Sequence, residues 1–258
     1  MAVIHGLTRF ADWFSGHREK YVLIGGCAAS TVMEEAGLTF RATKDLDVVL
    51  IVEAVDRSFA EVFFQFIEAG GYELRTRGTE GHPCFYRFSN PADASFPKMI
   101  ELFSRLPDLL RPLEEDNRTT PIPIDEDVSS LSAILLDEEA YRFVCNGRVE
   151  IGGIPFIDET RLIPLKAQAW MDLSDRRAAH PESVDSRNVA KHLKDVVRLS
   201  ELLVPNQAVE LPGRLEEDMG RFLDRAHALH DKDLATFGGR EPFRDALERV
   251  ARAFRLVA

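Results

Sequence analysis

The sequence is short of cysteine and of long apolar runs, and each shortage excludes a class of protein. The 258 residues include three cysteines, which lie far apart and form no C-x-x-C pair: Cys27, Cys84 and Cys145. An odd number at such spacing argues against a disulfide framework and a structural zinc site, and fits a reducing compartment. No apolar run approaches the roughly 20 residues that span a bilayer, and the first residues lack a secretory pattern. We therefore expect a soluble, cytoplasmic protein without a membrane partner.

Basic residues are also in deficit. Lys and Arg total 32 against 43 Asp and Glu, so the formal net charge is -11. Such a chain repels a polyanion on average and could bind one only through a local basic patch, so nucleic acid is not the default partner. Four arginines could form such a patch, although scattered arginines usually form solvated ion pairs: Arg75, Arg77, Arg87 and Arg105.

Apolar patterning divides the chain into two parts of different character. The first part combines helices at 7–17, 27–36 and 58–69 with strands at 21–24, 46–52, 72–76, 84–88 and 98–103. After Pro155, helical periodicity dominates, at 160–173, 185–203, 211–229 and 241–258. We therefore predict an α/β (α+β) domain with a mixed sheet over residues 1–155, followed by a C-terminal helical bundle over residues 156–258.

The junction between the two parts carries a turn signal. Asn146-Gly147 lies between the stretches 140–145 and 148–151. Asn-Gly readily adopts the left-handed conformations that a two-residue hairpin turn requires. The pattern therefore predicts two strands joined by a tight turn.

Two carboxylates, Asp45 and Asp47, stand one residue apart at the start of a predicted strand. They share a face, because side chains alternate along a strand. Two adjacent negative charges are unfavourable unless a cation, usually divalent and oxygen-seeking, lies between them. Glu101 is the obvious third acid, since an ionised side chain in the middle of an apolar strand needs a partner or a metal ion. Alternatively, Asp45 caps a turn and Glu101 faces solvent on an edge strand.

Gly25 and Gly26 end the first predicted strand and precede a helix. Glycines without a Cβ let backbone N–H groups approach a phosphate, and a helix N-terminus favours anions. Paired glycines also end many strands merely to make a turn, but these lie shortly before the acid pair. Together, the glycines and the carboxylates indicate a site for a metal ion and a nucleotide.

Two motifs follow one another in this region: Gly25-Gly26-x-Ala28 and Arg41-x-Thr43-x-Asp45-x-Asp47. Together they resemble the nucleotidyltransferase superfamily. The chain looks most like the AbiEii-type branch, the nucleotidyltransferase toxins of type IV toxin–antitoxin systems and their MenT-like relatives. That branch has a lysine-bearing helix and then a Lys-Asp helix, places that Lys166 and Lys194-Asp195 fill here. The resemblance covers about residues 21–203 and implies a nucleotidyltransferase-like mixed sheet.

The resemblance also implies a role for each motif residue. Asp45 and Asp47 would bind Mg²⁺, with Glu101 as the third acid or as the base that activates the acceptor hydroxyl. The nucleoside triphosphate (NTP) would be bound by Gly25, Gly26, Arg41, Thr43 and Lys166. Asp195 would orient Lys166 or the nucleotide. Phosphoryl-type transfer asks the protein mainly for positioning and charge neutralisation, which these residues can supply.

The implied activity is transfer of a nucleoside monophosphate (NMP) from an NTP to an acceptor, with release of pyrophosphate. The acceptor could be tRNA or protein, as for toxin relatives that have an antitoxin partner, or a small molecule, as for aminoglycoside-modifying relatives. A non-catalytic nucleotide-binding module is a third alternative. It stays open because Cys27 occupies the place where the family usually has serine. Cys27 itself is expected to be a small buried helix residue rather than a nucleophile.

The remaining charged residues allow more than one interpretation. Arg41 and Lys44 could reach a phosphate or could pair with Asp45. Four histidines in or near the predicted helices are expected at the surface: His180, His192, His227 and His230. His227 and His230 could share a helical face, but no third metal ligand accompanies them.

Overall fold

The computed structural model describes residues 4–51, 54–74, 85–103, 138–182, 184–229 and 242–256. The strands are β1 (Tyr21–Ile24), β2 (Asp45–Leu50), β3 (Glu73–Leu74), β4 (Phe85–Ser89), β5 (Met99–Phe103), β6 (Arg148–Ile151) and β7 (Ile154–Ile157). The helices are α1 (Leu7–Trp13), the 3-10 helix η1 (Arg18–Lys20), α2 (Gly25–Glu35), α3 (Arg57–Gly70), α5 (Glu138–Asn146), α6 (Glu159–Ala179), α7 (Ser186–Ser200), α8 (Gly213–His227) and α10 (Phe243–Ala253). Within these ranges, no helix has the length and apolar composition needed to cross a bilayer.

The strands form one seven-stranded sheet in the order β3-β4-β5-β2-β1-β7-β6. β2 runs parallel to β5 and β1 runs parallel to β7, whereas the other neighbours are antiparallel. The predicted mixed sheet is therefore confirmed, while its membership of the nucleotidyltransferase fold stays a prediction. The register places Asp47 opposite Glu101 and Asp45 opposite Met99. Because paired residues point to the same face, the three acids share one side of the sheet.

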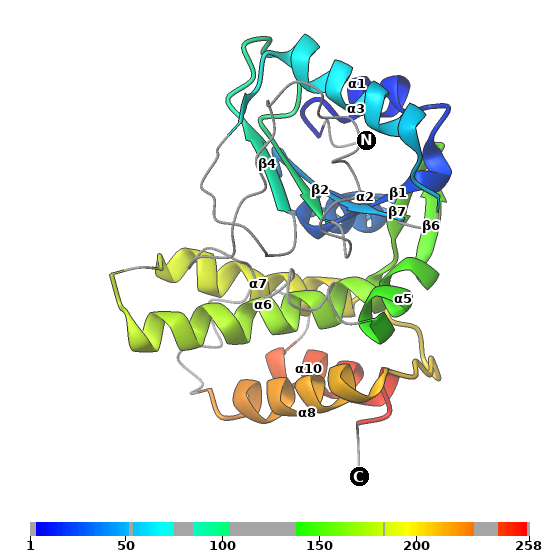
Figure 1. Ribbon diagram of the computed structural model, residues 1–258. Helices are drawn as coiled ribbons and strands as arrows, with labels where there is room; N and C mark the ends of the chain where they lie inside the picture. The colour runs from blue at the N-terminus through cyan, green and yellow to red at the C-terminus, as the bar shows by residue number, and fades with distance from the viewer. Residues whose placement is uncertain are drawn as a thin grey trace.

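Helices cover both faces of this sheet (Figure 1). α1 and α3 cover one face with an aromatic layer that includes the fully buried Phe10, Phe14, Phe59, Phe63 and Phe66. The spacing of the α3 phenylalanines keeps them on one helical face. α2 lies on the opposite face, next to the α6 and α7 pair, and α8 and α10 form the outermost layer.

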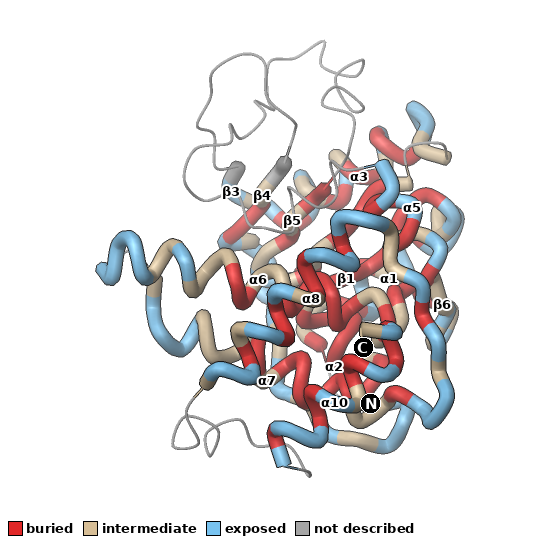
Figure 2. Tube along the Cα trace, turned by 90° about the horizontal axis from the view of Figure 1, so that it is seen from below, coloured by how far each residue is buried: buried red, intermediate tan, exposed pale blue. Residues whose placement is uncertain are grey.

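One buried cluster runs through all of these layers. It joins strand residues such as Val48 to Leu162 of α6, Phe222 of α8 and Leu247 of α10. Buried positions recur along α6, α8 and α10 in Figure 2, whereas the far end of the α6 and α7 pair is exposed. The sheet ends at Ile157 and α6 begins at Glu159, so the helical part follows the last strand directly.

The predicted hairpin at Asn146-Gly147 is wrong. The segment before it is the helix α5, whose buried Ala140, Tyr141 and Val144 have helical spacing. Gly147 lies against the side chain of Arg161, which a Cβ at this position would overlap. The hairpin instead joins β6 to β7 through Gly152-Gly153, both with positive φ. Helical periodicity over the preceding turns therefore outweighs the local Asn-Gly signal.

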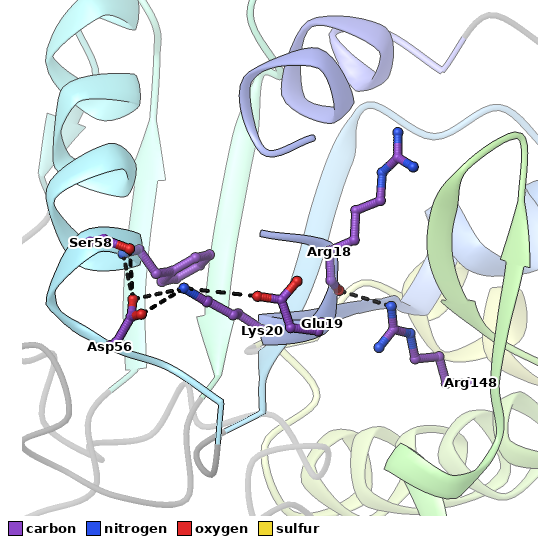
Figure 3. Close-up of polar contacts among 7 residues, drawn as sticks. Arg18, Glu19, Lys20, Asp56, Ser58 and Arg148 are labelled. Carbon is purple, nitrogen blue, oxygen red and sulfur yellow. Dashed lines mark hydrogen bonds and ion pairs between the residues drawn. The ribbon is translucent and has the colours of Figure 1, made fainter. Parts of the chain in front are cut away.

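A polar cluster fixes the start of β1 at the far end from the glycines (Figure 3). The buried Lys20 donates to both carboxylate oxygens of Asp56 at 2.8 Å. Asp56 also caps α3, since it accepts from the backbone N–H of Phe59 and the hydroxyl of Ser58. The hydrogen bond from Lys20 holds the pKa of Asp56 well below its usual range. The cluster thus links the start of β1 to the N-terminus of α3.

Candidate functional site

A pocket of about 300 Å³ opens where the ends of β1, β2 and β5 meet α6 and α7. Its lining includes eight of the nine residues predicted for the site: Gly25, Gly26, Arg41, Thr43, Asp45, Asp47, Glu101 and Lys166. The ninth, Asp195, contacts Arg41 and Lys166 from α7. Residues separated by more than a hundred positions in the chain are therefore brought to one place.

The acidic wall of the pocket consists of Asp45 and Asp47 on β2 and Glu101 on the neighbouring β5. Burial and the Glu101 carboxylate raise the pKa of Asp47 to about 7. The same two causes raise the pKa of Asp45. The Glu101 carboxylate thus opposes the ionisation of both aspartates, and a bound cation would relieve that repulsion.

Glu101 has a partner that the sequence did not reveal. Arg87 lies opposite Glu101 in the β4 and β5 register, and its Nε and Nη2 are 2.6 Å and 2.5 Å from Oε1. Glu101 is therefore neither solvent-facing nor unpaired, and Arg87 is engaged in this ion pair. The other arginines of the expected patch, Arg75, Arg77 and Arg105, lie outside the described residues.

The glycines make room for side chains of the motif itself. Gly25 has a φ of +67° and begins α2, and a Cβ there would overlap the Oδ2 atom of Asp47. A Cβ on Gly26 would lie 3.0 Å from the Thr43 hydroxyl oxygen. The N-terminus of α2 therefore begins beside Asp47, where its partial positive charge favours an anion. The sequence predicted close approach of a phosphate, and the structure adds this closer reason for glycine.

The cationic wall is organised by the buried Asp195. Arg41 donates from Nε and Nη2 to the two Asp195 oxygens at 2.8 Å and 2.7 Å, and the Lys166 ammonium lies 3.2 Å from Oδ2. Burial acts to raise the pKa of Asp195, but Lys166 and Arg41 hold it below its usual range. Arg41 therefore pairs with Asp195 and not with Asp45, the alternative that the sequence had left open. Asp195 fixes the position of Lys166.

Three further polar residues line the pocket and were not predicted from the sequence: Asp172 on α6, and Lys191 and His192 on α7. A signal was available, because Lys191 precedes Asp195 by four residues and so lies on nearly the same helical face. Asp172 likewise follows Leu165, another residue of the pocket lining, by seven residues, which is two helical turns. Both helices thus present several polar side chains to the pocket.

The prediction that His192 lies at the surface is wrong. The residue is half-buried, and its Nδ1 is buried without a hydrogen-bond partner in the described part of the chain. Burial and the nearby Lys166 lower its pKa to about 3, so the imidazole is neutral near pH 7. His180 and His227 are exposed, as predicted, and His230 lies outside the described residues.

Cys27 is fully buried in α2, as predicted. Burial and the charge of Asp47 raise the pKa of its thiol, so it stays protonated near pH 7. A thiolate is the nucleophilic form of cysteine, and this environment suppresses it. Cys27 therefore acts as a small packing residue beside the acidic wall.

The acidic wall has the donor chemistry of a magnesium site. Carboxylate oxygens are the ligands that Mg²⁺ prefers, and the raised pKa of Asp47 marks negative charge that a cation would stabilise. Among the residues that the structure describes, no group of three or more His, Cys, Asp or Glu side chains is already arranged around a metal position. Asp45 and Asp47 fit the ion, and Glu101, whose Oε1 is engaged by Arg87, has its Oε2 to offer as a third ligand.

Comparisons with known proteins do not assign the chain to a family. A scan against protein-family models finds no match, and a search of curated proteins finds none either. The function proposed below therefore depends on the chemistry of the pocket and on the resemblance of its motifs.

Proposed function

We propose that the protein is a magnesium-dependent nucleotidyltransferase of the AbiEii-type branch, which transfers an NMP from an NTP to an acceptor and releases pyrophosphate. One observation carries the proposal: a single pocket has an acidic wall of Asp45, Asp47 and Glu101 and a cationic wall that includes Arg41 and Lys166. Carboxylates suit a divalent ion, and cations suit the phosphates that such an ion accompanies.

Each wall would have its own task in this reaction. Asp45 and Asp47 would hold Mg²⁺, which supplies charge neutralisation to the triphosphate when bound. Lys166, positioned by Asp195, would face the phosphates. Glu101 would accept the proton of the acceptor hydroxyl as that oxygen bonds to the α-phosphorus and the bond to pyrophosphate breaks. The side chains thus position the reactants and balance charge without forming a covalent intermediate.

The acid pair is tested by the double variant Asp45→Asn/Asp47→Asn. Removing both carboxylates should lower magnesium-dependent transfer by at least about 100-fold, because the ion would lose its ligands. Labelled NTPs and pyrophosphate release give the measurement. A matched control, Asp12→Asn/Asp224→Asn, makes the same charge change at two exposed residues and should transfer like the parent. If the double variant binds and transfers nucleotide as well as the parent, the site assignment is wrong.

The acceptor is identified by which pool becomes labelled when the protein meets NTP with RNA, with protein or with an aminoglycoside. The net charge of -11 disfavours RNA unless a local basic surface engages it. Labelled RNA or protein would support a toxin-like activity, and a small neighbouring reading frame would then be the candidate antitoxin. Labelled aminoglycoside would support a small-molecule transferase instead.

A second candidate is a nucleotide-binding module without turnover. It is favoured by the ion pair that engages Glu101 with Arg87, together with Cys27 in the place of the usual serine. Calorimetry would then show tight NTP binding with no pyrophosphate release in any acceptor pool. Transfer that appears on Cys27→Ser would assign the loss of turnover to that position.

A further inference from the structure

The cations that line the pocket differ in whether they have an ion-pair partner. Arg41 and Lys166 both pair with Asp195, so one buried carboxylate already offsets part of their charge. Lys191, one turn before Asp195 on α7, lines the same pocket. In contrast to the other two, it makes no hydrogen bond or ion pair with any residue that the structure describes. Its charge is therefore available to a ligand.

Lys191 is half-buried and lies near two other positive charges. Burial, Arg41 and Lys166 all act against its protonated form and lower its pKa, with partial opposition from Asp195 and Asp47. A half-buried ammonium without a partner is unfavourable in the free protein, because it has lost water and gained no counter-charge. An anion in the pocket would provide that counter-charge, and it would also attract Arg41 and Lys166.

Lys191 also interacts electrostatically with both walls of the pocket. Its charge acts on Asp45 of the acidic wall, whose pKa it tends to lower, and on Arg41 and Lys166 of the cationic wall. A polyphosphate that shares a cation with Asp45 and Asp47 would have to extend from one wall toward the other. Lys191 lines the same pocket as both walls, so its ammonium is available to the phosphate groups of such a ligand.

We infer that Lys191 is a phosphate-binding residue of this pocket, and that it engages an unesterified phosphate group of a polyphosphate ligand. This inference deepens the proposed function, since the polyphosphate would then be the triphosphate of the NTP. It also separates the cations by role. Lys191 supplies a free charge to the ligand, whereas Arg41 and Lys166 share theirs with Asp195.

The probe is inorganic tripolyphosphate in metal-free buffer, with affinity measured by calorimetry. Lys191→Met should weaken binding at least 10-fold, whereas Lys191→Arg, which keeps the charge, should bind within about threefold of the parent. Lys98→Met is the matched control, because Lys98 is an exposed lysine that is not among the residues lining the pocket. It should bind like the parent. Circular dichroism checks that each variant is folded.

The outcomes separate this inference from the proposed transferase. Tripolyphosphate binding that depends on Lys191, without nucleotide transfer in any acceptor pool, would support the phosphate site and reject the enzyme. Transfer that depends on Asp45 and Asp47, with Lys191→Met binding tripolyphosphate as tightly as the parent, would support the enzyme and reject the role of Lys191. A parent protein that does not bind tripolyphosphate would also overturn the inference.

Discussion

At the residue scale, Asp47 is a carboxylate whose ionisation is strongly opposed by its surroundings in the pocket. It lies beside Glu101 across two parallel strands and against Gly25 at the start of α2. Burial and Glu101 raise its pKa to about 7, far above the usual value for aspartate. Ionisation of the carboxylate is therefore disfavoured in the metal-free protein, and a bound cation would favour it. Groups needed for ligand binding often reduce the stability of the free protein in this way.

We therefore predict that Asp47→Asn stabilises the metal-free protein. Because the folded-state pKa is raised, ionisation of Asp47 destabilises the fold increasingly as pH rises from about 4 to 7. The free energy of unfolding of the variant should exceed that of the parent by at least about 1 kcal/mol at pH 8, and the gain should vanish near pH 4. Urea unfolding in a chelating buffer measures both. Asp224→Asn, at an exposed site, should change neither value, and a loss of stability at pH 8 in Asp47→Asn would contradict the prediction.

Side-chain alternation was enough to predict that Asp45 and Asp47 share a face, because that property is local to one strand. The partner of Glu101 could not be predicted in the same way. Arg87 reaches it only because β4 pairs with β5 in a particular register, and register depends on the whole sheet. The presence of Lys191 and His192 in the pocket could be predicted only in part. Their helical spacing from Asp195 could have been read, but only the fold shows that this face of α7 meets the acidic strand.

At the scale of elements, Asp195 ties three segments together. It joins α7 to Lys166 of α6 and to Arg41, which precedes β2. An ion pair buried this deeply contributes little net stability by itself, but removing one member leaves the remaining charges without compensation. The triad therefore controls how the helices sit against the acidic end of the sheet.

We predict that Asp195→Asn lowers the free energy of unfolding by about 3 kcal/mol, because Arg41 and the buried Lys166 then face each other without a counter-charge. Urea unfolding at pH 7 provides the measurement. The control is Asp175→Asn, which breaks the more exposed ion pair between Asp175 and Arg225 and should cost less than about 1 kcal/mol. Equal losses in the two variants would show that the triad has no special structural role.

The elements themselves were predictable to different degrees. β2 and α3 have strong periodicity, and both were located within a residue or two of their observed bounds. α5 was missed because a short apolar stretch before Asn146-Gly147 suits a strand as well as a helix, and the turn signal favoured the strand. The helix is favoured by the contacts that the buried residues of α5 make with β2. One of them is the hydrogen bond from the Tyr141 hydroxyl to the carbonyl of Leu50 at 3.0 Å.

At the scale of the whole molecule, the change from mixed elements to helices does not interrupt the core. Buried residues of the sheet and of α6, α7, α8 and α10 belong to one cluster. The candidate site also takes its acidic wall from strands and its cationic wall largely from helices. The two predicted domains therefore share both their apolar interior and their polar pocket, which favours unfolding as one cooperative unit.

The two tryptophans of the chain can test this cooperativity, because one lies in each part. Trp13 of α1 packs edge-on against Phe66 at 5.4 Å, and Trp170 of α6 packs edge-on against Phe222 at 5.5 Å. The variants Trp13→Phe and Trp170→Phe each leave a single fluorescent reporter. The unfolding midpoint from fluorescence is compared with the midpoint of the same variant from circular dichroism, which corrects for any change in stability. In both variants the two transitions should coincide.

Ligand binding should move the two reporters together. A ligand that binds only the folded pocket stabilises every part of the cooperative unit by the same free energy, about 2.7 kcal/mol at a concentration 100 times its Kd. Magnesium and NTP should therefore shift both transitions equally, although neither tryptophan is among the residues lining the pocket. A shift confined to one reporter, or two transitions separated in denaturant, would show that the sheet and the helices unfold independently and that the shared core does not couple them.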